Sequence, residues 1–133
     1  MFDSSLRDYS TQLLKQLSEL PAQILAAERK VAELQQKQRA AQDALKARES
    51  DLLLGRDPQV QIDGKNAETR AAQLTQATAA ERAAIRELEA ALAQANADLD
   101  YLKYTYRAVV QAAHLTTTLL AVDAAATPVA LVS

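Results

Sequence analysis

Apolar residues recur along the second half of the chain at alternating steps of three and four. They are Ile85, Leu88, Leu92, Ala95, Leu99, Leu102, Tyr106 and Val109, named here the core stripe. This spacing is typical of the a and d positions of a helix that lies lengthwise against another helix. The pattern therefore predicts one long helix whose partner must come from elsewhere in the chain or from another chain.

The first half of the chain contains a matching stripe. Its a positions are Leu17, Ile24, Val31, Gln38, Leu45 and Leu52, and its d positions are Leu20, Ala27, Leu34, Ala41 and Arg48. Pro21 follows directly after Leu20, and a proline begins a new helix or kinks a continuous one. Because the heptad phase continues past Pro21, we predict a helix over residues 5–54 with a kink or short break near residue 21.

The residues that terminate helices are concentrated between the two glycines of the chain, Gly55 and Gly64. Gly55 suits the left-handed residue that ends a helix, and Pro58 prevents the helix from resuming. Residues 59–62 alternate polar and apolar types as a short strand does, but they have no visible partner strand, so we expect an extended loop. The loop is predicted over residues 55–65.

A second helix is predicted over residues 66–122, followed by an apolar tail over residues 123–133. Asn66, or Asp63 if the helix starts early, is a good N-cap, and Glu68 falls in the first turn. Two long helices joined by a loop of about ten residues fold back on each other. The fold class predicted is all-α: a single domain over residues 1–133 that forms a long antiparallel two-helix coiled-coil hairpin and oligomerises through its open end.

The two stripes also suggest a register for the hairpin. Pairing Leu52 with Ala67 places apolar residues opposite each other along both helices: Leu45 with Leu74, Leu34 with Ile85, Val31 with Leu88, Leu20 with Leu99, Leu17 with Leu102 and Leu13 with Tyr106. The same pairing places Gln38 opposite Glu81 and Ala41 opposite Thr78. A buried polar layer of this kind costs stability but disfavours slipped registers.

Composition restricts the kind of core and the kind of partner. The chain of 133 residues is alanine-rich, with one Phe, four Tyr and no Trp, which predicts a core one layer thick. Fifteen basic and seventeen acidic residues nearly cancel, so no net field attracts nucleic acid or an acidic membrane. The least charged stretch, residues 108–133, is interrupted by polar residues, and we expect it not to span a membrane. The first residues resemble no secretory signal, so we expect a cytoplasmic protein.

The ionisable residues show no catalytic pattern. His114 is the single histidine and there is no cysteine, so a zinc site lacks ligands. Lys65 follows Gly64 as in a phosphate-binding loop, but the first glycine and the final Ser or Thr of that motif are missing. Asp98 and Asp100 are two apart on a helix and point in different directions. We expect no enzymatic activity, no cofactor and no metal.

A second apolar stripe begins at Tyr101 and Tyr104 and continues on another face of the same helix. It runs through Ala108, Gln111, Leu115, Thr118 and Val122. A helix with two apolar faces needs two neighbours. We predict an oligomer interface at Tyr101, Tyr104, Ala108, Leu115 and Val122, in a homo-oligomer that is a dimer or a small ring. The alternative neighbour is the tail, folded back through Pro128; the tail residues Val129, Leu131 and Val132, with Phe2, Tyr9 and Leu14, otherwise leave an apolar patch at the open end.

Residues 101–107 also interleave tyrosines with basic residues. Lys103 and Arg107 beside stacked tyrosines are a candidate contact for single-stranded nucleic acid. Tyr106 belongs to the core stripe, however, and the net charge is close to zero, so the structural interpretation is preferred.

The run from Ile62 to Leu74, Ile-Asp-Gly-Lys-Asn-Ala-Glu-Thr-Arg-Ala-Ala-Gln-Leu, resembles small coiled-coil proteins encoded by tailed bacteriophages and prophages. The resemblance covers roughly residues 24–115, and its most specific part is residues 64–70. It implies a phage-encoded, non-enzymatic helical hairpin in the cytoplasm of a bacterial host, and it transfers no binding residues. We therefore expect a structural protein that binds itself and a protein partner. The alternatives are a nucleic-acid accessory factor in phage replication or recombination, and a hairpin chaperone similar to prefoldin or to export chaperones.

Overall fold

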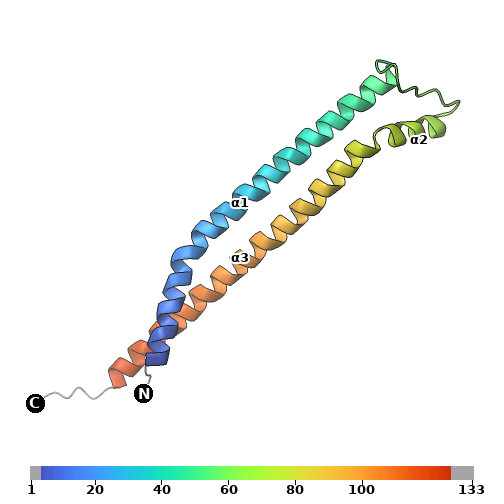
Figure 1. Cartoon of the computed structure of the whole chain (residues 1–133). Coiled ribbons are helices and arrows are strands. Elements are labelled where there is room, and N and C mark those ends of the chain that lie inside the picture. Colours follow the sequence, from blue (N-terminus) through green and yellow to red (C-terminus); the bar gives the residue numbers. More distant parts are fainter. Residues whose placement is uncertain (1–3, 127–133) are drawn as a thin grey trace, which may run out of the picture. The chain divides into compact units, whose positions relative to one another are not determined.

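The computed structural model describes residues 4–126, which form three helices. They are α1 (Ser4–Leu53), α2 (Ala67–Ala77) and α3 (Ala79–Ala126). The long helices α1 and α3 pack against each other as a helical hairpin, and the short α2 lies in the connection between them (Figure 1). The all-α hairpin predicted from the two stripes is confirmed.

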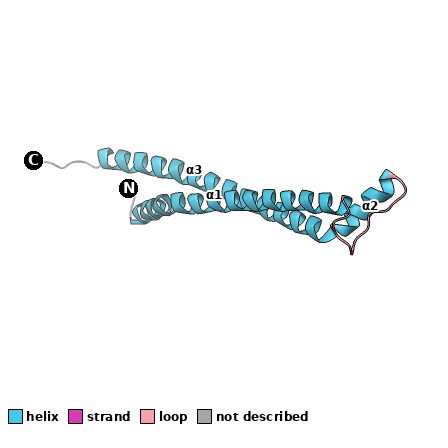
Figure 2. Cartoon of the chain, turned by 90° about the horizontal axis from the view of Figure 1, so that it is seen from above, coloured by secondary structure: helices cyan, strands magenta, loops and turns pink. Residues whose placement is uncertain are grey.

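The chain divides into two compact units. The terminal unit comprises the described parts of Met1–Glu28 and Ala97–Ser133, and the loop unit is Arg29–Asn96. The terminal unit contains the start of α1 and the end of α3, and the loop unit contains α2 and the residues between the helices (Figure 2).

The burial pattern follows the predicted stripes residue by residue. Between residues 18 and 47 of α1, every buried or half-buried side chain occupies a predicted a or d position, and all other positions are exposed. Between residues 85 and 100 of α3, only the core-stripe residues are buried or half-buried. The core is therefore a single layer of side chains, as the small size of these residues requires.

Helix α1 continues through Pro21 without a break. The short break considered for this position is therefore absent. Proline lacks the N–H that would bond to the carbonyl of the preceding turn, so the helix has one hydrogen bond fewer here. The neighbouring Leu20 side chain is buried.

The terminal unit has an apolar cluster of residues from both long helices. Leu13, Leu20 and Val109 are buried at its centre, and Leu17, Leu102, Tyr106, Ala112 and Ala113 pack around them. Burying a leucine of this kind contributes about 1.5–3 kcal/mol, so the cluster stabilises the helix pair here.

The residues that end α1 and begin α2 are those that the sequence predicts. Gly55 has φ +71°, the left-handed conformation that favours glycine at a helix end. Asn66 is the N-cap of α2, and its Oδ1 accepts a hydrogen bond of 2.8 Å from the Thr69 backbone N–H. Residues 59–62 form no strand and lie in an extended loop. The loop covers residues 54–66, one residue more at each end than predicted.

Side chains of α2 form hydrogen bonds to the loop. The Gln73 side chain accepts a hydrogen bond of 2.9 Å from the Gly64 N–H and donates one of 2.9 Å to Asp63 Oδ1. Arg70 Nη1 donates to the Gly64 carbonyl at 3.1 Å. The Gly64 N–H is therefore already bonded and is not a free donor of the kind that a phosphate-binding loop presents.

The predicted unbroken helix over residues 66–122 is wrong at Thr78. This residue has φ −108° and ψ 22° and ends α2, and α3 begins at the next residue. The Thr78 hydroxyl donates to the Leu74 carbonyl at 2.8 Å and accepts a bond of 2.9 Å from Arg82 Nε. A threonine hydroxyl that bonds to the carbonyl four residues earlier bends a helix. The predicted helix also ended too early, at residue 122, because α3 continues to Ala126.

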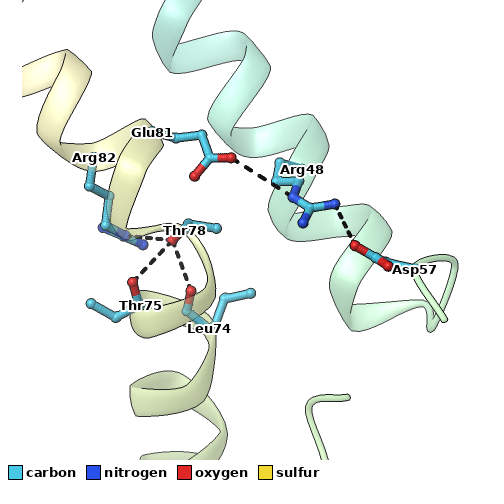
Figure 3. A network of polar contacts seen from close by, with 7 residues as sticks. All are labelled: Arg48, Asp57, Leu74, Thr75, Thr78, Glu81 and Arg82. Carbon is cyan, nitrogen blue, oxygen red and sulfur yellow. Dashed lines mark hydrogen bonds and ion pairs between the residues drawn. The ribbon is translucent and has the colours of Figure 1, made fainter. Parts of the chain in front are cut away.

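Polar contacts between the helices show that the predicted register is wrong in the loop unit. Arg82 Nη2 lies 2.7 Å from Glu49 Oε1, and Arg48 Nε lies 3.9 Å from Glu81 Oε1 (Figure 3 shows the second pair and the bonds of Thr78). The predicted register would place Arg48 opposite Ala71, about 15 Å further along the helix axis. The reason is that α2 has no buried residue, so the end of α1 faces the start of α3 instead of the start of α2. Leu52 and Thr78 are the most deeply buried side chains of the described chain.

Asp57 connects the loop to the same network. Its Oδ1 accepts a bond of 2.9 Å from the Gln59 N–H, and its Oδ2 lies 2.9 Å from Arg48 Nη1. The backbone hydrogen bond from Gln59 and then the bond from Arg48 lower the pKa of Asp57 below its usual value. The ionised carboxylate thus joins the loop to the last turns of α1.

Candidate interaction surface on the terminal unit

The second apolar stripe lies on the surface of α3. All seven of its residues are exposed, and together they form the exposed stripe: Tyr101, Tyr104, Ala108, Gln111, Leu115, Thr118 and Val122. The buried residues of this segment, Val109 and Thr116, lie on another face of the helix, because they fall between stripe positions. The structure therefore separates the two faces as the spacing predicts.

The exposure of the large residues in this stripe is high. Tyr101 is 69% exposed and Tyr104 is 67% exposed, and Leu115 and Val122 are each 59% exposed. No position of the stripe carries a charge. An apolar row of this length on an exposed helix face is a feature of interaction sites more than of solvated surfaces. The exposed hydrophobic residues of this helical hairpin thus indicate oligomerisation or binding to another protein.

A groove between α1 and α3 adjoins the first half of the exposed stripe. Its volume is about 350 Å³, and it is lined by Tyr9, Leu13, Gln16, Tyr101, Tyr104, Thr105, Ala108, Val109 and Ala112. Tyrosines from both helices contribute to its walls, and the alanines Ala108 and Ala112 leave space between them. Such a groove has room for side chains of a further helix. Apart from Tyr9, the α1 residues of this groove were not predicted, because their place beside α3 depends on the packing of the two helices.

The two basic residues proposed for nucleic-acid contact border the stripe. Lys103 and Arg107 are exposed and four residues apart, so they neighbour each other on the helix surface. Arg107 lines a shallow hollow with Tyr104, Ala108 and Gln111. Tyr106 is half-buried against the apolar cluster, so it is not available for stacking on a base. Two tyrosines and two cations thus remain on this surface.

Helix α3 is also apolar enough to raise the question of a membrane. One 18-residue window of Ala79–Ala126 has a mean hydropathy of 1.2 with at most two charged residues, and 11% of it is buried. By length and composition alone this helix qualifies as a membrane-crossing candidate, although the sequence led us to expect none in this region. A lipid surface is therefore one competing occupant of the exposed stripe.

The remaining candidate residues do not assemble into a chemical site. His114 is exposed, and its carbonyl accepts a bond of 3.0 Å from the Thr118 hydroxyl. Among residues 4–126, no three His, Cys, Asp or Glu side chains lie close enough to hold a metal ion. Phe2, Pro128, Val129, Leu131 and Val132, which the alternative with a folded-back tail requires, lie outside the described residues.

Comparison with protein families, with curated proteins and with solved structures finds no match to this chain.

Proposed function

We propose that this protein is a non-enzymatic helical hairpin that self-associates through the exposed stripe of α3. The observation that carries the proposal is the row of seven exposed, uncharged positions at coiled-coil spacing. In a coiled coil each such position inserts into a partner helix. Here α1 already occupies the other face of α3, so the partner of the exposed stripe comes from outside the hairpin.

The groove beside the stripe supports the same proposal. Tyr9 of α1 and Tyr104 of α3 both line it, so a helix laid along the stripe also contacts α1. Tyrosine adds contact area at a low cost in conformational entropy and is enriched at interfaces. The assembled form presents the loop unit and the outer helix faces to a protein partner. A phage-encoded origin belongs to this proposal and is supported by the resemblance of residues 64–70.

Sedimentation equilibrium of the full chain, over a range of protein concentrations, tests the proposal. We expect a mass above that of one chain. We expect the Tyr104→Glu variant to sediment as a monomer, because burying a carboxylate at the contact costs far more free energy than burying a tyrosine ring. The matched control is Val110→Glu, since Val110 is an exposed apolar residue of the same helix outside the stripe. Circular dichroism should show equal helicity in all three proteins. A wild-type monomer, or equal loss of mass in both variants, contradicts the proposal.

A further inference from the structure

We infer that the occupant of the exposed stripe is the same stripe of a second copy, lying antiparallel, with Gln111 at the two-fold axis. This inference rests on the proposed self-association and adds the orientation and the register. Antiparallel means that the amino-terminal end of one stripe faces the carboxyl-terminal end of the other. A two-fold axis makes the two contact surfaces identical.

Side-chain size favours the antiparallel arrangement. With Gln111 facing Gln111 of the second copy, each layer outward combines a larger with a smaller residue. Ala108 faces Leu115 of the second copy, Tyr104 faces Thr118, and Tyr101 faces Val122. A parallel arrangement would place tyrosine against tyrosine at one end and alanine against alanine at position 108. Packing at native density requires facing volumes to complement each other, and only the antiparallel arrangement achieves this in the layers on both sides of Gln111.

Charge favours the same orientation. Lys103 and Arg107 are exposed beside the first half of the stripe, and no charged residue occurs from position 108 to position 122. In a parallel pair, Lys103 would lie close to Lys103 of the second copy, and Arg107 close to Arg107 of the second copy. Like charges at that distance repel each other. In the antiparallel pair these cations lie beside the uncharged second half of the partner stripe. There the long stem of Arg107, which already lines a hollow with Tyr104 and Ala108, covers apolar surface.

The available area suffices for a dimer. Tyr101 and Tyr104, each about two-thirds exposed, offer roughly 100–170 Å² apiece, since a tyrosine buries about 150–250 Å² in full. With the five other stripe residues and half-exposed Tyr9, one copy offers on the order of 600 Å². Two copies then bury about 1,200 Å², the lower end of the range for specific interfaces.

The absence of cysteine from the chain makes cross-linking a direct test. The full-length variants Gln111→Cys, Tyr101→Cys and Val122→Cys are each oxidised alone, and the last two are also oxidised as a mixture. A disulfide requires Cα atoms within about 7 Å. In the antiparallel pair the two copies of position 101 are separated by roughly 30 Å along the axis. A second pair, Ala108→Cys mixed with Leu115→Cys, changes the surface less and serves if the first pair dissociates.

The inference predicts a covalent dimer for Gln111→Cys alone and for the mixture of Tyr101→Cys with Val122→Cys. It predicts at least tenfold less covalent dimer for Tyr101→Cys or Val122→Cys alone. Self-cross-linking of Tyr101→Cys shows a parallel pair, which overturns the inference and leaves the proposed function intact. A wild-type oligomer without any of these cross-links places the contact elsewhere and overturns both. A wild-type monomer overturns both as well. In that case, protection of the Gln111→Cys thiol from alkylation identifies the folded-back tail as the occupant of the exposed stripe. Sedimentation of the protein with phosphatidylglycerol vesicles identifies a lipid surface instead.

Discussion

The packing of the loop unit leads to a sharp prediction about two adjacent leucines. Leu52 is 1% exposed and Leu53 is 58% exposed, although both lie in the last turn of α1. Replacing Leu52 by alanine removes about three buried carbon groups, each worth about 0.8 kcal/mol, and leaves a cavity that adds to the loss. We expect Leu52→Ala to lower the free energy of unfolding by about 3 kcal/mol.

Leu53→Ala is the matched control. Both variants gain the same helix propensity, because both exchange leucine for alanine in the same helix. An exposed side chain contributes little, so we expect Leu53→Ala to change the free energy of unfolding by less than about 0.5 kcal/mol.

Urea unfolding followed by far-ultraviolet circular dichroism measures both effects at one fixed protein concentration. In thermal unfolding of a chain of this length, a loss of about 3 kcal/mol corresponds to a fall in Tm of roughly 10 °C. Equal destabilisation by the two variants would refute the placement of Leu52 in the core of the loop unit, and so would a loss below about 1 kcal/mol for Leu52→Ala.

Three further predictions concern the loop and its polar contacts. Gly64→Ala should lower the free energy of unfolding by about 1–3 kcal/mol, because the new Cβ would lie 2.7 Å from Thr69 Cγ2; an unchanged urea midpoint would contradict this. Glu49→Gln should cost about 1 kcal/mol by weakening the 2.7 Å contact with Arg82, a part-exposed pair screened by solvent, and molar salt should reduce the difference from wild type. Asp57 has a lowered pKa in the folded protein. Its contribution to stability is therefore present above the unfolded pKa near 3.9 and is lost as the pH falls through the lower folded pKa. The stability difference between wild type and Asp57→Asn should shrink below about pH 4, and a difference that grows with acid would contradict the assignment.

Much of the candidate surface follows from spacing alone. Tyr101, Tyr104, Leu115 and Val122 fall at steps of three and four that differ from those of the core stripe, and a helix turns these two sets of residues to different sides. Their exposure in the structure agrees with this geometry. The groove with Tyr9 needed the tertiary structure, because its shape depends on which turn of α1 lies beside Ala108 and Ala112.

The sequence by itself determined the two long helices, their inward faces, and the bend bracketed by Gly55 and Asn66. Each of these is a local property of spacing, of helix termination or of a single cap. Tertiary structure alone decided the break at Thr78 and the register between Arg48 and Glu81. The physical reason is that a slip of about eleven residues is close to three helical turns, so it returns the same face to the interface and keeps leucine and alanine buried. The apolar pattern therefore cannot distinguish the two registers, and the contacts of Glu49 with Arg82 and of Arg48 with Glu81 belong to the one observed.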